Sequence, residues 1–291
     1  MFSADLLANA VVAGVLLGGF YAAVAIGLAI VFGQLDIVNI AHPAFVIVGA
    51  YTAYILNSRL GFDPVLVGLL AAPVFFIVGV LLYRIYFLAF ERTGQESLSG
   101  LAFFFGVMFI IEVVLIMVYG VDYRLVQADY IGRVWSIGFV DFPLRMLVPF
   151  SVSALLTAGI YLYLSRTFMG RAIQAVAQDR LALQLMGADP VRIKQWAFGL
   201  GIATAAIAGS LLIVIGPVEP SVGRQYIGRA FAIVVLGGMG SIPGMFIAAL
   251  ILGIVESLVS TFAGPSWSPA VAFGVLALTL ALRPAGLFGR S

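Results

Sequence analysis

The stretch Leu6–Gly33, LLANAVVAGVLLGGFYAAVAIGLAIVFG, decides the fold class because it contains no charged side chain. The hydrocarbon core of a bilayer is about 30 Å thick, and a helix needs about 20 apolar residues to cross it. The stretch exceeds that length. It also lacks the basic start and the short apolar run of a cleavable signal peptide, so it is interpreted as the first membrane span.

The rest of the chain has the same character. Of its 291 residues, 63% are hydrophobic and only 10% are charged, whereas a soluble domain carries roughly 25% charged residues. The mean hydropathy of +1.16 extends over the whole chain. An ordinary soluble enzyme is therefore excluded. The absence of cysteine and the single histidine, His42, also exclude disulfides, thiolate chemistry and a paired-histidine metal site.

Further apolar stretches predict a polytopic, all-α membrane protein that forms one transmembrane domain over residues 1–291. Eight stretches are long enough to span, and a shorter one, Tyr226–Met239, is of about half length. We therefore expect eight or nine transmembrane helices. The long stretches are Leu6–Gly33, Ile37–Leu56, Pro64–Phe90, Leu98–Tyr119, Leu144–Ser165, Ile193–Gly216, Gly244–Phe262 and Trp267–Leu282.

Two segments interrupt the apolar pattern. Gln34–Pro43 places Asp36, Asn39 and His42 before a proline, and Gly237–Gly244 is rich in glycine. Broken helices at matching places in two halves of a chain are typical of a transport pathway. Two short loops between spans explain the pattern equally well, and the sequence leaves both readings open.

The basic residues predict the orientation, because short cytoplasmic loops carry an excess of Lys and Arg. The segment 166–194 holds a third of the chain's 15 basic residues and is expected to be cytoplasmic. Its composition, rich in Ala, Leu and Gln, predicts a pair of short amphipathic helices. Counting spans then places the N-terminus and the loop 120–143 outside and the C-terminus inside, provided that residues 226–239 cross the membrane rather than re-enter it.

The longest of four distinctive stretches is GRAIQAVAQDRLALQLMGADPVRIKQWAFGLGIATAAIAGSL, at 170–211, and the others are Val38–Tyr51, Ala232–Ser257 and Arg283–Gly289. These stretches resemble the permeases of high-affinity branched-chain amino acid ABC importers, and the shorter, LivH-type permease subunit matches best. The stretch 170–211 resembles the cytoplasmic coupling segment of that family. This chain has Pro43 where the family usually has glycine, so the resemblance does not define the backbone conformation at this position.

The resemblance implies a permease subunit in a bacterial inner membrane, surrounded by lipid. A second permease of the LivM type would share the pathway, whether the pair is a heterodimer or a homodimer. Two ATP-binding subunits of the LivG and LivF type would bind ATP and Mg²⁺, and a periplasmic binding protein would deliver substrate. This chain lacks a phosphate-binding GxxxxGK[ST] loop, so no cofactor and no ATP hydrolysis are expected of it, nor any nucleic acid. Branched-chain amino acids, urea, amides and aromatic acids all remain open as substrates.

The resemblance also assigns contact with the ATPases to the segment 166–194. Gly170 is expected to let the chain turn, Arg171 and Arg180 to make charged contacts, and Asp179 to cap or bridge. Leucines and Met186 are expected to present an apolar face to the ATPase groove. The coupling candidates are Gly170, Arg171, Gln178, Asp179, Arg180, Leu181, Leu183, Leu185, Met186 and Gly187.

The pathway candidates lie in the two interrupted segments, because unwound backbone within a membrane must line a cavity or be buried in protein. They are Asn39, His42, Gly237, Gly238 and Ser241. A hydrogen-bonded histidine at a helix break is the simpler reading of His42.

Two intramembrane acids keep an alternative open. Glu112 and Glu256 suit an ion-coupled secondary transporter, although the sequence offers neither of them a convincing partner. Glu256 can instead pair with a basic residue or face the second permease, and Glu112 can form an interhelical hydrogen bond. Gly14 and Gly18, four residues apart, favour close helix packing, either within the chain or against the second permease.

Overall fold

The computed structural model describes residues 4–93, 98–138, 140–283 and 285–289, and these residues are almost entirely helical. The helices are α1 (Ala4–Leu35), α2 (His42–Leu60), α3 (Pro64–Ala89), α4 (Leu98–Tyr119), α5 (Leu144–Arg166), α6 (Phe168–Gln178), α7 (Arg180–Leu185), α8 (Pro190–Ile215), α9 (Gly223–Gly237), α10 (Ile242–Phe262) and α11 (Ser268–Leu282). Short 3-10 turns are η1 (Glu91–Thr93), η2 (Pro220–Val222) and η3 (Pro265–Trp267), and one hairpin pairs β1 (Val134–Ile137) with β2 (Val140–Pro143).

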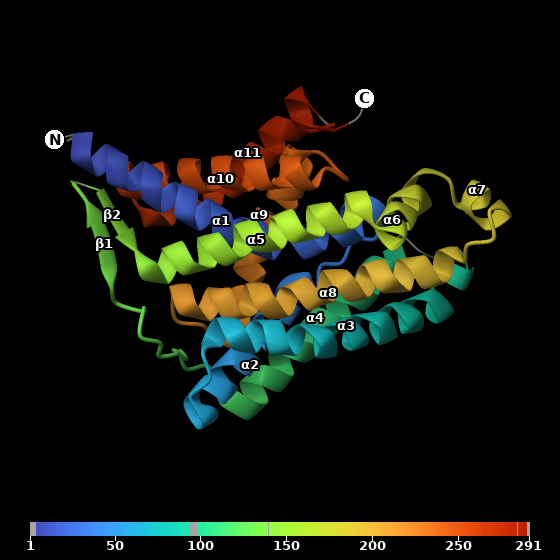
Figure 1. Cartoon of the computed structure of the whole chain (residues 1–291), viewed down its shortest axis with the longest axis horizontal. Coiled ribbons are helices and arrows are strands. Elements are labelled where there is room, and N and C mark those ends of the chain that lie inside the picture. The colour runs from blue at the N-terminus through green and yellow to red at the C-terminus, as the bar shows by residue number, and fades with distance from the viewer. Residues whose placement is uncertain (1–3, 94–97, 139, 284, 290–291) are drawn as a thin grey trace.

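The long helices run side by side and define two ends of the molecule (Figure 1). The N-terminal end of α1 lies beside the β-hairpin, where the side chain of Asn9 accepts a hydrogen bond of 2.9 Å from the backbone N–H of Asp141. We call this the hairpin end. At the opposite end, which we call the α6–α7 end, the side chain of Gln34 donates a 2.9 Å hydrogen bond to the carbonyl of Gly240. The start of α1 and the described part of the 120–143 loop thus lie at one end, and the basic 166–194 segment at the other, as the basic residues predict.

Among the described residues, seven helical stretches are long and apolar enough to cross a membrane: α1, α3, α4, α5, α8, α10 and Pro265–Leu282. The buried centre consists of α1 and α8, while α3, α4, α5 and α11 expose much of their surface. These outer helices carry rows of exposed Leu, Val, Ile and Phe side chains, as lipid contact requires. The chain is therefore a polytopic all-α membrane protein, as its composition predicts.

The two remaining segments, α2 and α9, are partly unwound. Residues 36–41 are not helical, and the expected span from Ile37 becomes a helix only at His42. Before α9, residue Val218 pairs with Arg124 of the 120–143 loop in a short antiparallel bridge, so this segment starts at the hairpin end. It finishes at Gly238, beside Gly289 at the α6–α7 end. The segment therefore passes from one end to the other, as the expected crossing requires.

The expected interruption at Gly237–Gly244 is a tight turn between α9 and α10, not a break within a span. Gly238 and Gly240 adopt φ values of +90° and +86°, a region that costs glycine little. The loop reading is thus confirmed for this segment, whereas Gln34–Pro43 contains a true break. The hairpin β1–β2 was not expected.

Glycines bring α1 and α10 into backbone contact. A Cβ atom on Gly14 would lie 2.6 Å from the Cα of Ile254, and one on Gly18 would lie 2.7 Å from the carbonyl oxygen of Ala249. On α10, a Cβ on Gly253 would meet the carbonyl oxygen of Gly14 and the N–H of Gly18 at 2.5 Å. The spacing of Gly14 and Gly18 therefore serves packing within this chain.

Replacing Gly253 by leucine is expected to prevent stable packing of α1 on α10, because backbone atoms that cannot move aside occupy the space. Overpacking of a core usually lowers the free energy of unfolding by about 1–3 kcal/mol. Because the obstructing atoms at this distance belong to the backbone, we expect a larger loss for this variant. Thermal unfolding in detergent measures the loss. Gly274→Leu on α11, where a Cβ meets open space, is the matched control and should unfold close to the wild type. Equal stability of both variants would contradict this packing.

Candidate transport and coupling sites

The break before α2 is lined by buried polar groups. Asn39 and His42 are fully buried. The side-chain oxygen of Asn39 accepts a 3.1 Å hydrogen bond from the N–H of Ala41, and the Nε2 atom of His42 lies 3.0 Å from the carbonyl oxygen of Val24. In the described part of the chain, the Asn39 amide nitrogen and the His42 Nδ1 atom have no hydrogen-bond partner. The polar groups at the break are therefore only partly hydrogen-bonded, and these two buried atoms remain without a partner among the described residues.

The residues around this break allow α1, α2 and α8 to pack closely against one another. Pro43 occupies the first turn of α2, a position where no intrahelical N–H bond is lost. The departure from glycine is thus accommodated without a kink. A Cβ on Gly27 would lie 2.4 Å from the His42 ring and 2.5 Å from Thr204, so only glycine lets α1 approach α2 and α8 here.

The second group of pathway candidates surrounds the turn between α9 and α10. Gly237 packs against α10, where a Cβ would lie 2.5 Å from the N–H of Met245. Ser241 caps α10 by accepting a 3.1 Å hydrogen bond from the N–H of Gly244. These residues lie at the α6–α7 end, away from the fully buried Asn39 and His42. The structure therefore does not unite the pathway candidates in one site.

A cavity of about 500 Å³ adjoins this turn at the α6–α7 end. It is lined by parts of α1, α5, α6, the α9–α10 turn and the C-terminal segment. Its polar lining side chains are Gln34, Tyr161, Gln174, Gln178 and Ser241. The cavity brings Ser241, a pathway candidate, together with Gln178, a coupling candidate. Gln34, Tyr161 and Gln174 were not expected here, because their meeting depends on how α5 and α6 pack.

The segment between α5 and α8 forms the predicted pair of short helices, α6 and α7. Thr167 caps α6 through a 3.0 Å bond from the N–H of Gly170. Asp179 caps α7 by accepting bonds of 2.9 Å from the N–H groups of Leu181 and Ala182. Gly187 ends this run with φ +81°. The expected capping by Asp179 is therefore present.

Gly170 has a different role from the expected turn. It lies inside α6, where a Cβ would meet the carbonyl oxygen of Tyr163 at 2.2 Å and the Cα of Leu164 at 2.5 Å. The glycine lets α6 fold back against α5. Arg171 and Gln178 are exposed. The side chain of Arg180 lies outside the described residues.

One side of α7 is apolar and exposed. Leu185 and Met186 are 82% and 83% exposed, and Leu181 is exposed as well, whereas Leu183 is buried. Leu183 therefore anchors α7 to the molecule and does not share the outer face. In Figure 1, α7 lies at the far tip of the α6–α7 end, clear of the bundle. An apolar face that projects in this way suits contact with another protein.

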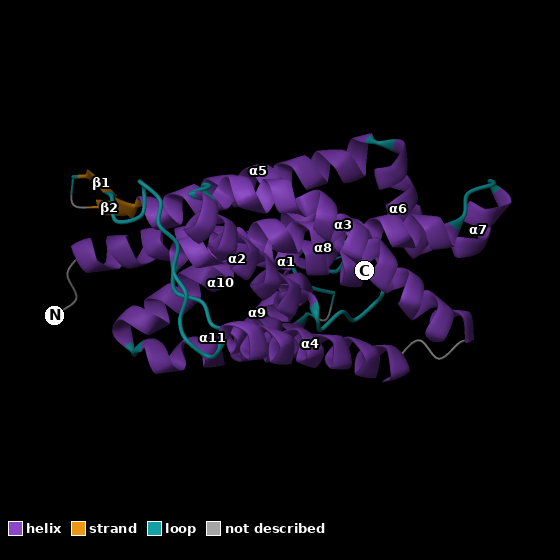
Figure 2. Ribbon diagram, turned by 90° about the horizontal axis from the view of Figure 1, so that it is seen from below, coloured by secondary structure: helices purple, strands orange, loops and turns teal. Residues whose placement is uncertain are grey.

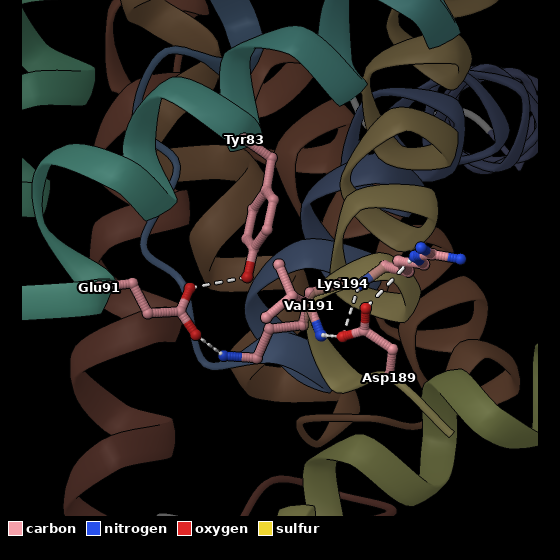
Figure 3. A network of polar contacts seen from close by, with 6 residues as sticks. Tyr83, Glu91, Asp189, Val191 and Lys194 are labelled. Atoms are coloured by element: carbon pink, nitrogen blue, oxygen red, sulfur yellow. Dashed lines mark hydrogen bonds and ion pairs between the residues drawn. The ribbon is translucent and has the colours of Figure 1, made fainter. Parts of the chain in front are cut away.

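A buried ion pair joins this segment to the bundle (Figure 3). Lys194 at the start of α8 donates to a carboxylate oxygen of Glu91, and both side chains are buried. The hydroxyl of Tyr83 on α3 donates a 2.7 Å bond to the other oxygen of Glu91. One turn earlier, Asp189 caps α8 through a 2.9 Å bond from the N–H of Val191. The Lys194–Glu91 pair thus joins the start of α8 to the turn η1 that follows α3.

Replacing Lys194 by methionine is expected to destabilise the folded chain by about 3–5 kcal/mol, because the change leaves the buried Glu91 carboxylate without its cation. Denaturant or thermal unfolding of the purified chain measures the loss. The double variant Lys194→Met with Glu91→Gln should lose less than Lys194→Met alone, since no buried charge remains. Unfolding of the double variant at or below the midpoint of the single variant would contradict this account.

The two intramembrane acids both have arginine partners. Glu256 on α10 accepts bonds of 2.9 and 2.6 Å from Arg229 of α9, and Ser268 donates to the same oxygen. Glu112 on α4 accepts a 2.8 Å bond from Nε of Arg224 and a second bond from Nη2. The expected pairing of Glu256 and the interhelical bond of Glu112 are therefore confirmed. These partners could not be identified from the sequence, since each pair depends on how α9 is rotated.

These features define a class: a multi-pass membrane protein with one broken span, a polar cavity at one end and an apolar helix that projects beyond the bundle. Within the described residues, no group of three or more His, Cys, Asp or Glu side chains that could hold a metal ion was found.

A family model described as "Branched-chain amino acid transport system / permease component" matches residues 10–280. The chain belongs to this family.

Individual relatives agree over nearly the full length. The chain is 30% identical to the high-affinity branched-chain amino acid transport system permease protein BraD of Pseudomonas aeruginosa, with 95% of this chain and 94% of BraD covered. It is 29% identical to the corresponding protein LivH of Escherichia coli K12, with the same coverage. It is also 30% identical to the LivM permease of that strain, over 92% of this chain and 67% of LivM. No solved structure matches the chain.

Proposed function

We propose that the chain is the LivH-type permease subunit of an ABC importer that takes up branched-chain or closely related amino acids across a bacterial inner membrane. The observation that carries the proposal is the family match over residues 10–280. A second permease of the LivM type would complete the pathway, in keeping with the similarity of this chain to both LivH and LivM. Two ATP-binding subunits, which would hold ATP and Mg²⁺, and a periplasmic binding protein would complete the importer.

In this proposal the α6–α7 end faces the cytoplasm and the hairpin end faces the periplasm. The excess of basic residues in 166–194 supports this orientation. The exposed Leu181, Leu185 and Met186 on α7 would enter a groove on an ATP-binding subunit. Closure of the ATPases would then move α8, which follows α7 along the chain, and the Lys194–Glu91 pair would pass this movement to the end of α3.

Substrate would pass along the partly unwound segments. The break at Asn39 and His42 holds buried polar atoms that have no hydrogen-bond partner among the described residues, and a rearranged pathway could use them. The cavity beside Ser241 would form the cytoplasmic exit, where amide and hydroxyl groups can hydrogen-bond a zwitterion weakly enough to release it. The ion-coupled alternative has less support, because Glu112 and Glu256 are both engaged with arginine.

Purification of the tagged chain from its native membrane in mild detergent, followed by mass spectrometry, tests this assembly. A second permease and ATP-binding subunits in stoichiometric amounts are expected. Recovery of the chain without any ATP-binding subunit, in a preparation that still takes up amino acid, would refute the proposal.

A further inference from the structure

Arg224 is a half-exposed cation at the level of the membrane. Its side chain is 55% exposed, although its partner Glu112 is only 6% exposed. Glu112 lies two turns before the end of α4 at Tyr119, so the pair lies about 10 Å inside the bundle from the hairpin end. The pair is therefore within the span and not at its rim.

The surroundings on α4 are apolar. Phe109, Ile110 and Val113 flank Glu112 and are exposed. A guanidinium that faced lipid at such a depth would cost about 2.5–3.5 kcal/mol on insertion scales. Arg224 therefore faces either water or another protein in the assembled membrane complex.

The segment that carries Arg224 is polar where it begins, at 217–225, and apolar further on. Residues 217–222 are not part of a long helix, Glu219 and Ser221 are half-buried, and Gln225 beside Arg224 is exposed. Figure 2 shows α4 and α11 along one edge of the molecule, with α9 next to them toward the middle. Irregular polar backbone is tolerated at this depth only where it lines a cavity or is covered by protein.

We propose that Arg224 receives the α-carboxylate of the transported amino acid, in the periplasmic half of the pathway, where this face meets the second permease. The inference rests on the function proposed above and narrows its substrate class. Carboxylate-bearing amino acids would be accepted, whereas urea and amides lack the group that Arg224 recognises.

The geometry of the pair suits this role. A guanidinium has five N–H donors, and the described bonds to Glu112 use Nε and Nη2. Nη1 has no described acceptor, and the side chain as a whole is 55% exposed. Glu112 holds the guanidinium in place and neutralises most of its charge. A substrate carboxylate would then be bound strongly enough to be oriented, and weakly enough to leave.

The absence of cysteine from the chain allows a direct test. In the complete transporter, Gln225→Cys places a reporter beside an intact Arg224. A hydrophilic thiol reagent should label it, as quantified on this chain by mass spectrometry. Leucine should slow the labelling, whereas leucinamide, which lacks the carboxylate, should not. Adding Arg224→Gln should remove the protection. Val114→Cys, on the exposed apolar face of α4, is the unlabelled control.

Transport measurements separate a pathway role from a structural one. Arg224→Gln should lower the maximal rate of ATP-driven leucine uptake at least tenfold, while ATP hydrolysis stimulated by the loaded binding protein stays within twofold. Arg224→Lys should restore part of the rate, and Arg59→Gln, on the exposed outer end of α2, should match the wild type. A wild-type complex that takes up no leucine would refute the proposed function itself. If the wild type does take up leucine, any one of three results would overturn the role of Arg224. These are undiminished uptake by Arg224→Gln, protection by leucinamide equal to that by leucine, and no labelling of Gln225→Cys.

Discussion

The double variant Leu185→Glu with Met186→Glu is expected to lose ATP-driven uptake by at least a hundredfold, although the chain still folds and inserts. Both side chains are more than four-fifths exposed on α7, so neither contributes to the core of this chain. Full burial of a Leu or Met side chain contributes about 1.5–3 kcal/mol. Loss of two such contacts corresponds to a factor of about a hundred or more in affinity for the ATPases. Carboxylates in an apolar groove add a desolvation cost.

Two readouts check this result. Co-purification reports whether the ATP-binding subunits remain attached, and uptake into proteoliposomes reports coupling. Leu185→Met with Met186→Leu keeps the volume and the apolar character and should behave as the wild type. Leu183→Ala, by contrast, should act through stability, because Leu183 is the buried residue that anchors α7 to the molecule. If the double glutamate variant retains both ATPases and full uptake, the outer face of α7 is not the coupling surface.

The second large effect is expected at Glu256, whose carboxylate is almost fully buried between α9, α10 and α11. Glu256→Leu leaves the buried Arg229 guanidinium without a counter-charge. Arg229 also lies over the rings of Tyr21 and Tyr226, at 5.8 and 5.6 Å, but these contacts do not neutralise it. Removing one member of a buried pair costs about 3–5 kcal/mol, which is a large share of the stability of a domain.

The yield of monodisperse protein after extraction, and its unfolding temperature, measure the effect of Glu256→Leu. Glu256→Gln retains an oxygen that can accept from Arg229 and Ser268 and should be milder. The combined variant Glu256→Leu with Arg229→Leu should recover part of the loss, because no charge is left behind. Normal yield and stability of Glu256→Leu alone would mean that the Glu256–Arg229 pair contributes little to the stability of the folded chain.

Much of the fold follows from local patterns in the sequence. Apolar stretches predicted the spans because a helix that crosses a bilayer needs apolar side chains along its whole length. The basic residues of 166–194, together with the count of spans, predicted which segments share an end. Asp179 was expected to cap or bridge, and it caps α7, since a cap depends on neighbouring residues alone.

The features that were not predicted depend on contacts between distant parts of the chain. The helical part of the second span starts at His42 and not at Ile37, and Ile37, Asn39 and Ala41 of the non-helical stretch are buried within the bundle. Gly170 looked like a turn residue but serves the packing of α6 on α5. Arg224 and Glu112 are far apart in sequence, so no spacing rule could pair them. The cavity beside Ser241 likewise forms only where five segments converge.

The central claim is that this chain conducts an amino acid only when ATPase subunits drive it. The most direct measurement is uptake of radiolabelled leucine by liposomes that contain the purified complex, with the binding protein outside and ATP inside. Accumulation above the external concentration is expected with ATP and Mg²⁺, and none is expected with a proton or sodium gradient alone. Accumulation driven by an ion gradient in the absence of ATP would contradict the account.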